Sequence, residues 1–347
     1  MNVAEDLAGA ATAARASESE AAPRLGFLGV GWIGAHRMRC VAESGVGSVI
    51  AMADVAPTTL ANAMSVAPGA VAADSLDALL DLDLDGIVIA TPSAQHAAQA
   101  IAALERGVAV FCQKPLGRTA DETRRVVDAA RSADRLLGVD LSYRHTAAMQ
   151  SIRPLIAQEA LGRVYAVDLV FHNAYGPDKP WFYDRASSGG GCVIDLGIHL
   201  VDLALWCLSF PVVASVTSRL YSKGAPLEVA RDRVEDYAVA RLDLESGATI
   251  QLACSWNLSA GQDAVIGATF YGSEGAASMS NVGGSFYDLR AEWFRGTSRE
   301  SLVEPPDEWG GRAAVAWAER LATGAGFDAE AERLVDVAAV IDRIYHR

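Results

Sequence analysis

Apolar and polar positions divide the chain into two regions with different periodicities. Between Leu25 and Leu141, short apolar runs alternate with segments whose apolar residues recur at helical spacing. Strands that alternate with helices in this way are typical of βαβ units, so we predict an α/β domain with a doubly wound parallel sheet over residues 24–142. The predicted strands are 25–28, 49–53, 70–71, 86–90, 108–111 and 136–141, and the predicted helices are 35–44, 75–80, 94–106 and 119–133.

Beyond residue 142 the alternation stops, and longer strands follow one another closely. A helix is predicted over 145–158, a strand over 163–173, an aromatic-rich loop over 174–188 and an apolar helix over 193–208. Short turn signals separate the next strands, so we predict an α+β domain over 143–347 whose large open sheet is mostly antiparallel. Its later strands are predicted at 212–221, 234–244, 248–256, 264–272 and 276–280, and two helices at 313–323 and 328–345.

The composition of the chain argues against several classes of protein and partner. The 347 residues suffice for about two domains, and 51% of them are hydrophobic, as in an ordinary globular protein. The net charge of −14 argues against nucleic-acid and anionic-membrane partners, and no apolar run is long enough to span a bilayer. Five widely spaced cysteines without a Cys-x-x-Cys motif indicate reduced thiols and predict no metal site. Residues 1–23 lack the pattern of a signal peptide, so we expect a flexible tail and a cytoplasmic protein.

A glycine-rich turn follows the first predicted strand. Gly29, Gly31 and Gly34 form a G-x-G-x-x-G pattern between a strand and a helix, which is typical of the dinucleotide-binding fingerprint of a Rossmann domain. The first glycine makes the tight turn, the second admits the pyrophosphate, and the third lets helix and strand pack closely. With Trp32 and Ile33, these glycines would hold the phosphates at the helix N-terminus, where free N–H groups favour anions.

Asp54 ends the second predicted strand, about twenty residues after the last glycine of the fingerprint. A carboxylate there accepts a hydrogen bond from the ribose 2′-hydroxyl and repels a 2′-phosphate, and no Arg or Lys follows it directly. The pattern therefore favours NAD over NADP as the cofactor. The alternative interpretation is a structural glycine turn with an incidental surface acid.

Two further strand ends carry candidate ligand-binding residues. Ligands of open parallel sheets lie outside the carboxyl ends of the strands, so Thr91, Pro92 and His96 are expected to face the cofactor. For His96, an ordinary surface position is the alternative. The next strand delivers Gln113 and Lys114 to the same edge of the sheet, where both are candidates for contacts with the cofactor. A lysine fixed there by the following proline is also well placed to donate to a substrate oxygen.

A second glycine-rich segment, 189–199, leads into the apolar helix. Asp195, His199 and Asp202 are spaced so that one helix face would carry all three. An imidazole beside carboxylates suits proton transfer to a bound small molecule, because its pKa lies near working pH. A purely structural Asp/His pair is the alternative interpretation.

The order of these motifs resembles the Gfo/Idh/MocA oxidoreductases, named for glucose–fructose oxidoreductase and inositol dehydrogenase. The similarity rests on the fingerprint, on Lys114-Pro115 and on the Gly-Gly-x-x-x-Asp-x-Gly-x-His segment that ends at His199, and it extends from Leu25 onwards. It implies a Rossmann domain joined to an α+β domain whose open sheet often forms the dimer interface. It also implies NAD(P)-dependent oxidation or reduction of a hydroxyl or ketone of a sugar, inositol or related polyol.

Carried over by motif, the resemblance assigns catalytic roles to Lys114, Asp195 and His199. His199 would take the hydroxyl proton as general base, and Lys114 would donate to the same oxygen. Asp195 would orient the imidazole or contact a second hydroxyl. Arg144 and Trp181 are further candidates for contacts with a sugar substrate.

Position 113 departs from the family pattern, because the family usually has Glu-Lys-Pro where this chain has Gln113. Without that carboxylate, either the lysine loses its proton more readily or Gln113 contacts the cofactor through its amide. Two alternatives to a dehydrogenase stay open: an NAD-dependent glycosidase on the same fold, and a non-catalytic sensor that binds NAD and a sugar. As assembly we expect a homodimer or homotetramer through the open face of the second sheet.

Overall fold

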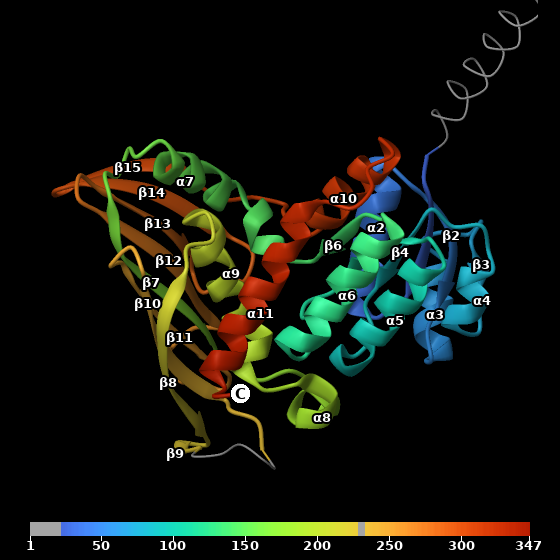
Figure 1. Ribbon diagram of the computed structural model, residues 1–347, viewed down its shortest axis with the longest axis horizontal. Helices are drawn as coiled ribbons and strands as arrows, with labels where there is room; N and C mark the ends of the chain where they lie inside the picture. Colours follow the sequence, from blue (N-terminus) through green and yellow to red (C-terminus); the bar gives the residue numbers. More distant parts are fainter. Residues whose placement is uncertain (1–21, 228–232) are drawn as a thin grey trace, which may run out of the picture.

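The computed structural model describes residues 22–227 and 233–347 and places two domains side by side (Figure 1). Of the tail predicted over residues 1–23, all but the last two residues lie outside the described part of the chain. The predicted division after residue 142 falls in a short 3₁₀ turn, η2 (Ser142–His145), which leads from the first sheet to the second domain. The boundary itself stays a prediction.

The first domain is built on a parallel sheet. Within the described residues it has six strands in the order β3-β2-β1-β4-β5-β6, which confirms the predicted doubly wound α/β fold. β4 and β5 are buried along their whole length, because helices cover both faces of the sheet. The strands are β1 (Arg24–Leu28), β2 (Ser48–Ala53), β3 (Val71–Ala72), β4 (Gly86–Ile89), β5 (Ala109–Cys112) and β6 (Leu137–Val139), and the helices are α2 (Trp32–Ser44), α3 (Pro57–Met64), α4 (Leu76–Leu80), α5 (Ser93–Glu105) and α6 (Ala120–Ala133).

The second domain is a large sheet with helices on one face. Within the described residues, nine strands run in the order β15-β14-β13-β12-β7-β11-β10-β8-β9. β7 and β11 pair in parallel and the other neighbours are antiparallel, so the predicted mostly antiparallel sheet is confirmed. β14 and β15 extend this sheet beyond the predicted strands. The strands are β7 (Val164–Asn173), β8 (Val213–Ser222), β9 (Ala225–Pro226), β10 (Tyr237–Leu244), β11 (Thr249–Ser255), β12 (Ala264–Gly272), β13 (Ala276–Asn281), β14 (Leu289–Arg295) and β15 (Ser298–Val303).

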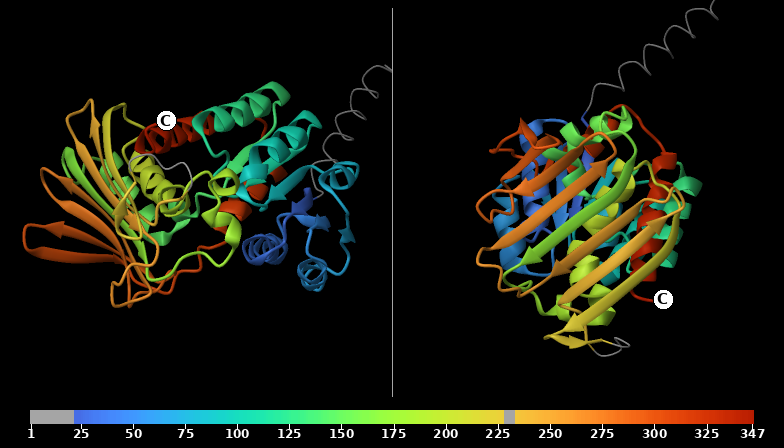
Figure 2. Two further views of the ribbon diagram at one scale, coloured as in Figure 1. Left: turned by 90° about the horizontal axis from the view of Figure 1, so that it is seen from below. Right: turned by 90° about the vertical axis from the view of Figure 1, so that its left-hand side faces the viewer.

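The two faces of this sheet differ in what covers them. α7 (Ala147–Ala157), α9 (Ile198–Cys207) and α11 (Arg333–Ile344) pack on one face (Figure 1), whereas the opposite face stays uncovered by the described residues (Figure 2, right). On the uncovered face, Val239, Ala253, Val170 and Gly267 are neighbours across β10, β11, β7 and β12. These four residues are partly exposed, so the centre of the open face carries an apolar row.

The C-terminal helices tie the second domain back to the first. α10 (Arg312–Ala322) packs on the Rossmann sheet, with the rings of Trp317 and Phe111 5.7 Å apart. A Cβ at Gly86 or Gly138 would lie 2.6 or 2.7 Å from the Trp317 ring, so both glycines make room for it. α11 follows a 3₁₀ turn, η5 (Ala329–Glu332), and lies between α6 and α9 (Figure 1). The sequence pattern does not predict this position of α11 between the two domains.

The apolar helix predicted over 193–208 consists of two elements. A π-helical turn, η4 (Val193–Gly197), precedes α9. The aromatic loop before it contains η3 (Pro180–Tyr183) and α8 (Arg185–Ser188). By length and composition, Arg185–Cys207 could cross a membrane, yet 94% of its apolar window is buried inside the protein. Burial on all sides is typical of a helix in the core of a large domain.

Candidate active site

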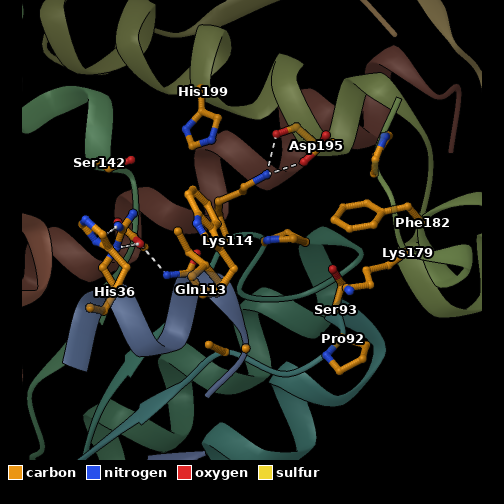
Figure 3. A pocket seen from close by; sticks show the side chains of 18 of the residues that line it. His36, Pro92, Ser93, Gln113, Lys114, Ser142, Lys179, Phe182, Asp195 and His199 are labelled. Carbon is orange, nitrogen blue, oxygen red and sulfur yellow. Dashed lines mark hydrogen bonds and ion pairs between the residues drawn. The ribbon is translucent and has the colours of Figure 1, made fainter. Parts of the chain in front are cut away.

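A cavity of about 600 Å³ opens between the two domains. One wall comes from the first turns of α2 and from the residues that follow β4, β5 and β6; the other comes from η4, α9 and the loop around η3. Figure 3 shows Lys114, Asp195 and His199 pointing into the same space from these two walls. The convergence expected from the motifs is therefore present in the geometry.

The fingerprint turn has the backbone geometry that each glycine position requires. Gly29 has a φ of 81°, and a Cβ there would lie 2.6 Å from the backbone oxygen of Ala90. A Cβ at Gly34 would lie 2.1 Å from the backbone oxygen of Gly29, so α2 packs directly on the turn. At Gly31 nothing lies within 4 Å of a Cβ, and residues 31–33 line the cavity. The turn thus leaves an open helix N-terminus of the kind that binds a pyrophosphate.

Asp54 lies beside this turn, at the carboxyl end of β2. Its Oδ2 accepts a hydrogen bond from the backbone N–H of Val30 at 2.9 Å, and its Oδ1 accepts one from Ala56 at 2.8 Å. The carboxylate is thereby fixed against the fingerprint backbone, in the position where the ribose contact is expected. The contact with a ribose stays a prediction.

Thr91 and Pro92 line the cavity, as the strand-end rule predicts. His96 also lines it, but the surface-histidine alternative is wrong because the residue is only 1% exposed. One ring nitrogen lies 2.7 Å from the backbone oxygen of Pro115 and the other 2.7 Å from that of Thr91. His96 therefore ties together the loops that follow β4 and β5, and burial lowers its pKa.

Gln113 belongs to a buried polar cluster on the Rossmann wall. Its Nε2 donates to Asp140 Oδ2, which also accepts from Arg37 Nε at 2.6 Å. Arg37 Nη1 lies 3.0 Å from His36 Nδ1, and all four residues line the cavity. Figure 3 shows His36 and Gln113 on this wall. Arg37 and Asp140 belong to none of the sequence motifs and were not predicted as site residues. Asp140 directly follows β6, so the rule that singled out Thr91 and Gln113 at strand ends would have found it.

Lys114 reaches across the cavity to the second domain. Its Nζ donates to the carboxylate of Asp195 at 2.6 Å and to the backbone oxygen of the same residue at 2.6 Å. The other carboxylate oxygen of Asp195 accepts from Trp256 Nε1 at 3.0 Å. Asp195 therefore orients the lysine, and the expectation that it orients the imidazole of His199 is wrong. The hydrogen bonds of its two carboxylate oxygens come from Lys114 and Trp256, whereas His199 Nδ1 has no partner among the described residues.

His199 enters the cavity from the first turn of α9. It is 7% exposed, its Nδ1 has no hydrogen-bond partner among the described residues, and its ring packs edge-on against Tyr143 at 5.0 Å. Burial, followed by the positive charges of Lys114 and Arg37, lowers the pKa of His199 well below 6.5. The imidazole is therefore neutral near pH 7, which is the form that accepts a proton.

Of the three polar residues predicted to share one helix face, Asp195 and His199 line the cavity and Asp202 does not. Asp202 is buried and pairs with Arg144, whose Nε donates to Asp202 Oδ2 at 2.8 Å. Arg144 also lies over the rings of Trp206 and Phe210, at 5.7 and 5.6 Å, and does not line the cavity. The prediction that Arg144 contacts the substrate is therefore wrong. The physical cause is that α9 is buried on all sides, so an acid within it needs a buried cation.

Aromatic rings from the loop around η3 form the remaining part of this wall. Trp181 lines the cavity, as expected for a residue that contacts a sugar, and stacks on Phe182 with ring centroids 3.8 Å apart. Phe182 lies edge-on to Trp256 at 6.3 Å, which links the loop to the tryptophan that holds Asp195. The aromatic surface is therefore packed in place on the same wall as the polar groups.

A buried carboxylate fixes the backbone just before Asp195. Glu235 Oε1 accepts from the backbone N–H groups of Gly191 at 3.0 Å and Val193 at 2.9 Å, and from the hydroxyl of Tyr345 at 2.7 Å. A Cβ at Gly191 would lie 1.9 Å from the backbone oxygen of Glu235, so this close approach requires glycine. Burial raises the pKa of Glu235. No sequence motif identifies these hydrogen bonds of Glu235, because the residues that make them are far apart along the chain.

Among residues 22–227 and 233–347, no group of three or more His, Cys, Asp or Glu side chains is arranged to hold a metal ion. The five cysteines, all within the described ranges, are free thiols.

The family models place both domains. Residues 24–141 match the oxidoreductase family model with an NAD-binding Rossmann fold, and residues 149–278 match the C-terminal domain model of the same GFO/IDH/MocA family. Together the two matches cover most of the chain and identify its first domain as an NAD-binding Rossmann domain.

Individual relatives agree with this placement. The chain is 27% identical to D-glucoside 3-dehydrogenase of Escherichia coli (strain K12) over 58% of its length, and 30% identical to 1,5-anhydro-D-fructose reductase of Ensifer adhaerens over 58%. These alignments span 60% and 59% of the relatives' own lengths. The structure of levoglucosan dehydrogenase in complex with NADH has the same fold, with a TM-score of 0.79, 19% identity, and coverage of 94% of this chain and 96% of that one. The chain belongs to the Gfo/Idh/MocA oxidoreductase family.

Proposed function

We propose that this protein is an NAD-dependent oxidoreductase that transfers a hydride between its cofactor and a secondary hydroxyl or ketone of a sugar, inositol or related polyol. The observation that carries the proposal is the convergence of His199 and the Lys114–Asp195 pair on one cavity beside the dinucleotide fingerprint. Family membership and the names of the relatives, a glucoside dehydrogenase and an anhydrofructose reductase, support the same reaction class.

The residues present fit a bound NAD. Gly31 leaves open space at the N-terminus of α2 for the phosphates, and Asp54 is held against the turn with no Arg or Lys directly after it. When bound, NAD supplies the acceptor for the hydride of the substrate carbon. Its use in preference to NADP follows from the charge of Asp54, which repels a 2′-phosphate.

His199 and Lys114 have different roles at the substrate oxygen. The neutral imidazole of His199 takes the hydroxyl proton, and the ammonium of Lys114 donates to the same oxygen and stabilises its developing negative charge. Asp195 accepts hydrogen bonds from the lysine and holds it in this position, and Trp256 donates to Asp195 and fixes that carboxylate. In the reverse direction, the imidazolium returns the proton to the alkoxide.

A substrate panel with matched variants tests the proposal. Purified protein and NAD are incubated with inositols, hexoses, pentoses and amino sugars while NADH formation is followed by absorbance. His199→Asn and Lys114→Ala should each lower kcat by about 10²- to 10⁴-fold while the Kd for NAD stays near the wild-type value. As control, His172→Asn should keep turnover, because His172 is hydrogen-bonded to Ser255 at 2.7 Å and does not line the cavity.

Two results would contradict this proposal. Tight NAD binding without NADH formation across the whole panel would favour the non-catalytic sensor. Cleavage of a nitrophenyl glycoside without net NADH would favour the glycosidase.

We also propose that the protein forms a homodimer or homotetramer through the open face of the second sheet. The apolar row of Val239, Ala253, Val170 and Gly267 on that face supports this assembly, since such a row is complementary to a copy of itself. Val170→Glu should yield a smaller species by light scattering after gel filtration. A wild-type monomer would contradict the proposal. The cytoplasmic location stays a prediction, which fractionation of the host cell tests.

A further inference from the structure

Tyr143 lies at the centre of an aromatic cluster beside His199. It belongs to η2, the turn that leads from the first sheet to the second domain, and it is only 7% exposed. The ring centroids of His199, Trp309 and Phe171 lie 5.0, 4.9 and 5.6 Å from that of Tyr143. Contacts with three rings hold the phenol ring in place, so the direction of its hydroxyl is fixed as well.

The hydroxyl of Tyr143 has no hydrogen-bond partner among the described residues. Its oxygen is not one of the enclosed unpaired side-chain atoms in this part of the chain, so it opens onto the cavity that Tyr143 lines. Tyr345 shows the usual arrangement of a buried tyrosine: its hydroxyl donates to Glu235 at 2.7 Å and accepts from the backbone N–H of Ile194 at 3.1 Å. Because buried polar groups are normally paired, a ligand in the cavity is the partner expected for Tyr143.

Near pH 7 this phenol is a neutral hydrogen-bonding group. Burial, followed by the electrostatic effects of Tyr287 and Asp195, raises the pKa of Tyr143 above its usual range. The phenol therefore does not act as a base. Tyr287 and Asp195 also line the cavity, so the phenol oxygen faces the same space as the Lys114–Asp195 pair. A hydroxyl that both donates and accepts is suited to pairing with a hydroxyl of a sugar or polyol.

The reacting oxygen of the proposed substrate already has two partners, because it gives its proton to His199 and accepts a hydrogen bond from Lys114. The ring of Tyr143 lies edge-on to the imidazole, with 60° between their planes, so a substrate that contacts His199 also passes beside Tyr143. Neighbouring hydroxyls of a sugar or cyclic polyol lie within hydrogen-bond distance of each other. The hydroxyl next to the reacting one is therefore the group within reach of the phenol.

We propose that the Tyr143 hydroxyl binds the substrate hydroxyl adjacent to the reacting one, so that the preferred substrate is a vicinal diol: a sugar or polyol with a free hydroxyl beside the carbon that is oxidised. This assignment rests on the proposed function and names the substrate class of the same site. Tyr143 is a specificity-determining residue, which contributes to substrate binding and takes no part in proton or hydride transfer.

Tyr143→Phe tests the assignment, because it removes only the hydroxyl and keeps the packed ring. KM and kcat are measured for both proteins with D-glucose, with myo-inositol and with the monodeoxy analogues of each. The variant should raise KM about 10-fold and leave kcat within about 2-fold, because a neutral hydrogen bond to the bound substrate is lost. With the analogue that lacks the neighbouring hydroxyl, both proteins should have the same KM; with the other active analogues the difference should persist.

Tyr165→Phe is the matched control for the loss of a phenol hydroxyl. Tyr165 is 52% exposed and does not line the cavity, so KM and kcat should stay at wild-type values with every compound.

Thermal melts without ligand test whether the hydroxyl is unpaired in the free protein. Tyr143→Phe should melt at or slightly above the wild-type temperature, because no hydrogen bond within the protein is lost. Tyr345→Phe loses the hydrogen bond to Glu235 and should melt at a lower temperature. A fall in Tyr143→Phe as large as that in Tyr345→Phe would show that the hydroxyl has a partner in the protein, and would overturn the assignment.

Three kinetic results would also overturn the assignment of Tyr143. A fall in kcat with every analogue would place its hydroxyl on the reacting oxygen. A weaker affinity for NAD in Tyr143→Phe would place the hydroxyl on the cofactor. An unchanged KM with all compounds would mean that water is its only partner.

A binding measurement separates this assignment from the proposed function. If the wild type formed no NADH, the proposed function would fail, and isothermal titration of D-glucose and myo-inositol into the protein with NADH would make the same comparison. Tighter binding by the wild type than by Tyr143→Phe would still support the assignment. Equal affinity of the two proteins, or no binding of either compound, would overturn it.

Discussion

The two walls of the cavity are built in different ways. On the Rossmann wall, each functional group follows a strand or begins a helix, so short local motifs place the fingerprint turn, Thr91 and Lys114. On the opposite wall, Asp195 is held by Lys114 and Trp256, which are 81 and 61 residues away in the chain. The turn before it is fixed by Glu235 and Tyr345, which are 110 residues apart.

This difference separates cofactor binding from chemistry. The groups expected to hold NAD depend on backbone geometry within a few residues, whereas Asp195 and His199 depend on the packing of the whole second domain. Lys114 acts on the substrate from the Rossmann wall; damage to the rest of that wall should weaken NAD binding. Damage to the second wall should lower kcat while the Kd for NAD stays near wild type.

Two glycine substitutions should show the different roles of the two walls most strongly. In Gly34→Ala the new Cβ would lie 2.1 Å from the backbone oxygen of Gly29, and in Gly191→Ala it would lie 1.9 Å from that of Glu235. Each forces the backbone to move, at a cost of about 1–3 kcal/mol. We expect Gly34→Ala to lose NAD affinity and Gly191→Ala to lose turnover, as measured by fluorescence titration and steady-state rates.

Gly69→Ala is the matched control for both substitutions. Nothing lies within 4 Å of a Cβ at Gly69, so stability, NAD affinity and kcat should stay at wild-type values. If Gly191→Ala lowered NAD affinity as much as Gly34→Ala, the separation of the two walls would be wrong.

Asp54→Asn should have the next largest effect. The substitution removes the charge expected to bind the ribose and to repel a 2′-phosphate, and a hydrogen bond to a charged group contributes about 1.5–3 kcal/mol. NAD should therefore bind about 10- to 100-fold more weakly, while the preference for NAD over NADP narrows. Isothermal titration with both dinucleotides measures this. An unchanged preference would remove Asp54 from the cofactor site.

Glu235→Gln should have a smaller effect, confined to the second wall. The amide keeps the shape but weakens the hydrogen bonds from Gly191, Val193 and Tyr345, because charge-assisted bonds are roughly twice as strong as neutral ones. We expect kcat to fall about 10-fold with the Kd for NAD unchanged. Tyr345→Phe removes one of these bonds and should give a milder loss of the same kind. A loss of NAD affinity in either variant would contradict this expectation.

The pH dependence gives the smallest effect and tests His199 directly. Its pKa is lowered well below 6.5, so the neutral base persists as the pH falls through 6.5, and kcat/KM for alcohol oxidation should decline only below that value. A profile measured over the acid range in a constant-ionic-strength buffer shows the midpoint. A midpoint above 6.5 would mean that the imidazole is more exposed to water than the structure has it.

Local signals were enough to predict the fold and, on the Rossmann wall, the fingerprint turn, Thr91 and Lys114. The alternation of short apolar runs gave the Rossmann sheet, and the spacing of Gly29, Gly31 and Gly34 gave its fingerprint turn, because both depend on neighbouring residues. The strand-end rule placed Lys114 correctly for the same reason. The helical spacing also predicted one face for Asp195 and His199, and both line the cavity.

The partners of these residues could not be predicted in the same way. Spacing alone gave Asp195, His199 and Asp202 a shared role, whereas burial of α9 pairs Asp202 with Arg144, 58 residues away. The bond from Arg37 to Asp140 joins residues 103 apart. Pairings of this kind are decided by which elements the fold brings together, so the local spacing of residues in a sequence does not reveal them.

The proposed chemistry depends on His199 and Lys114 acting on one substrate oxygen, and a double-mutant cycle on kcat measures that most directly. Groups that act as a unit are strongly non-additive, so His199→Asn combined with Lys114→Ala should be about as slow as the worse single variant. Rate losses that multiply in the double variant would show that the two side chains act independently, and would contradict the account.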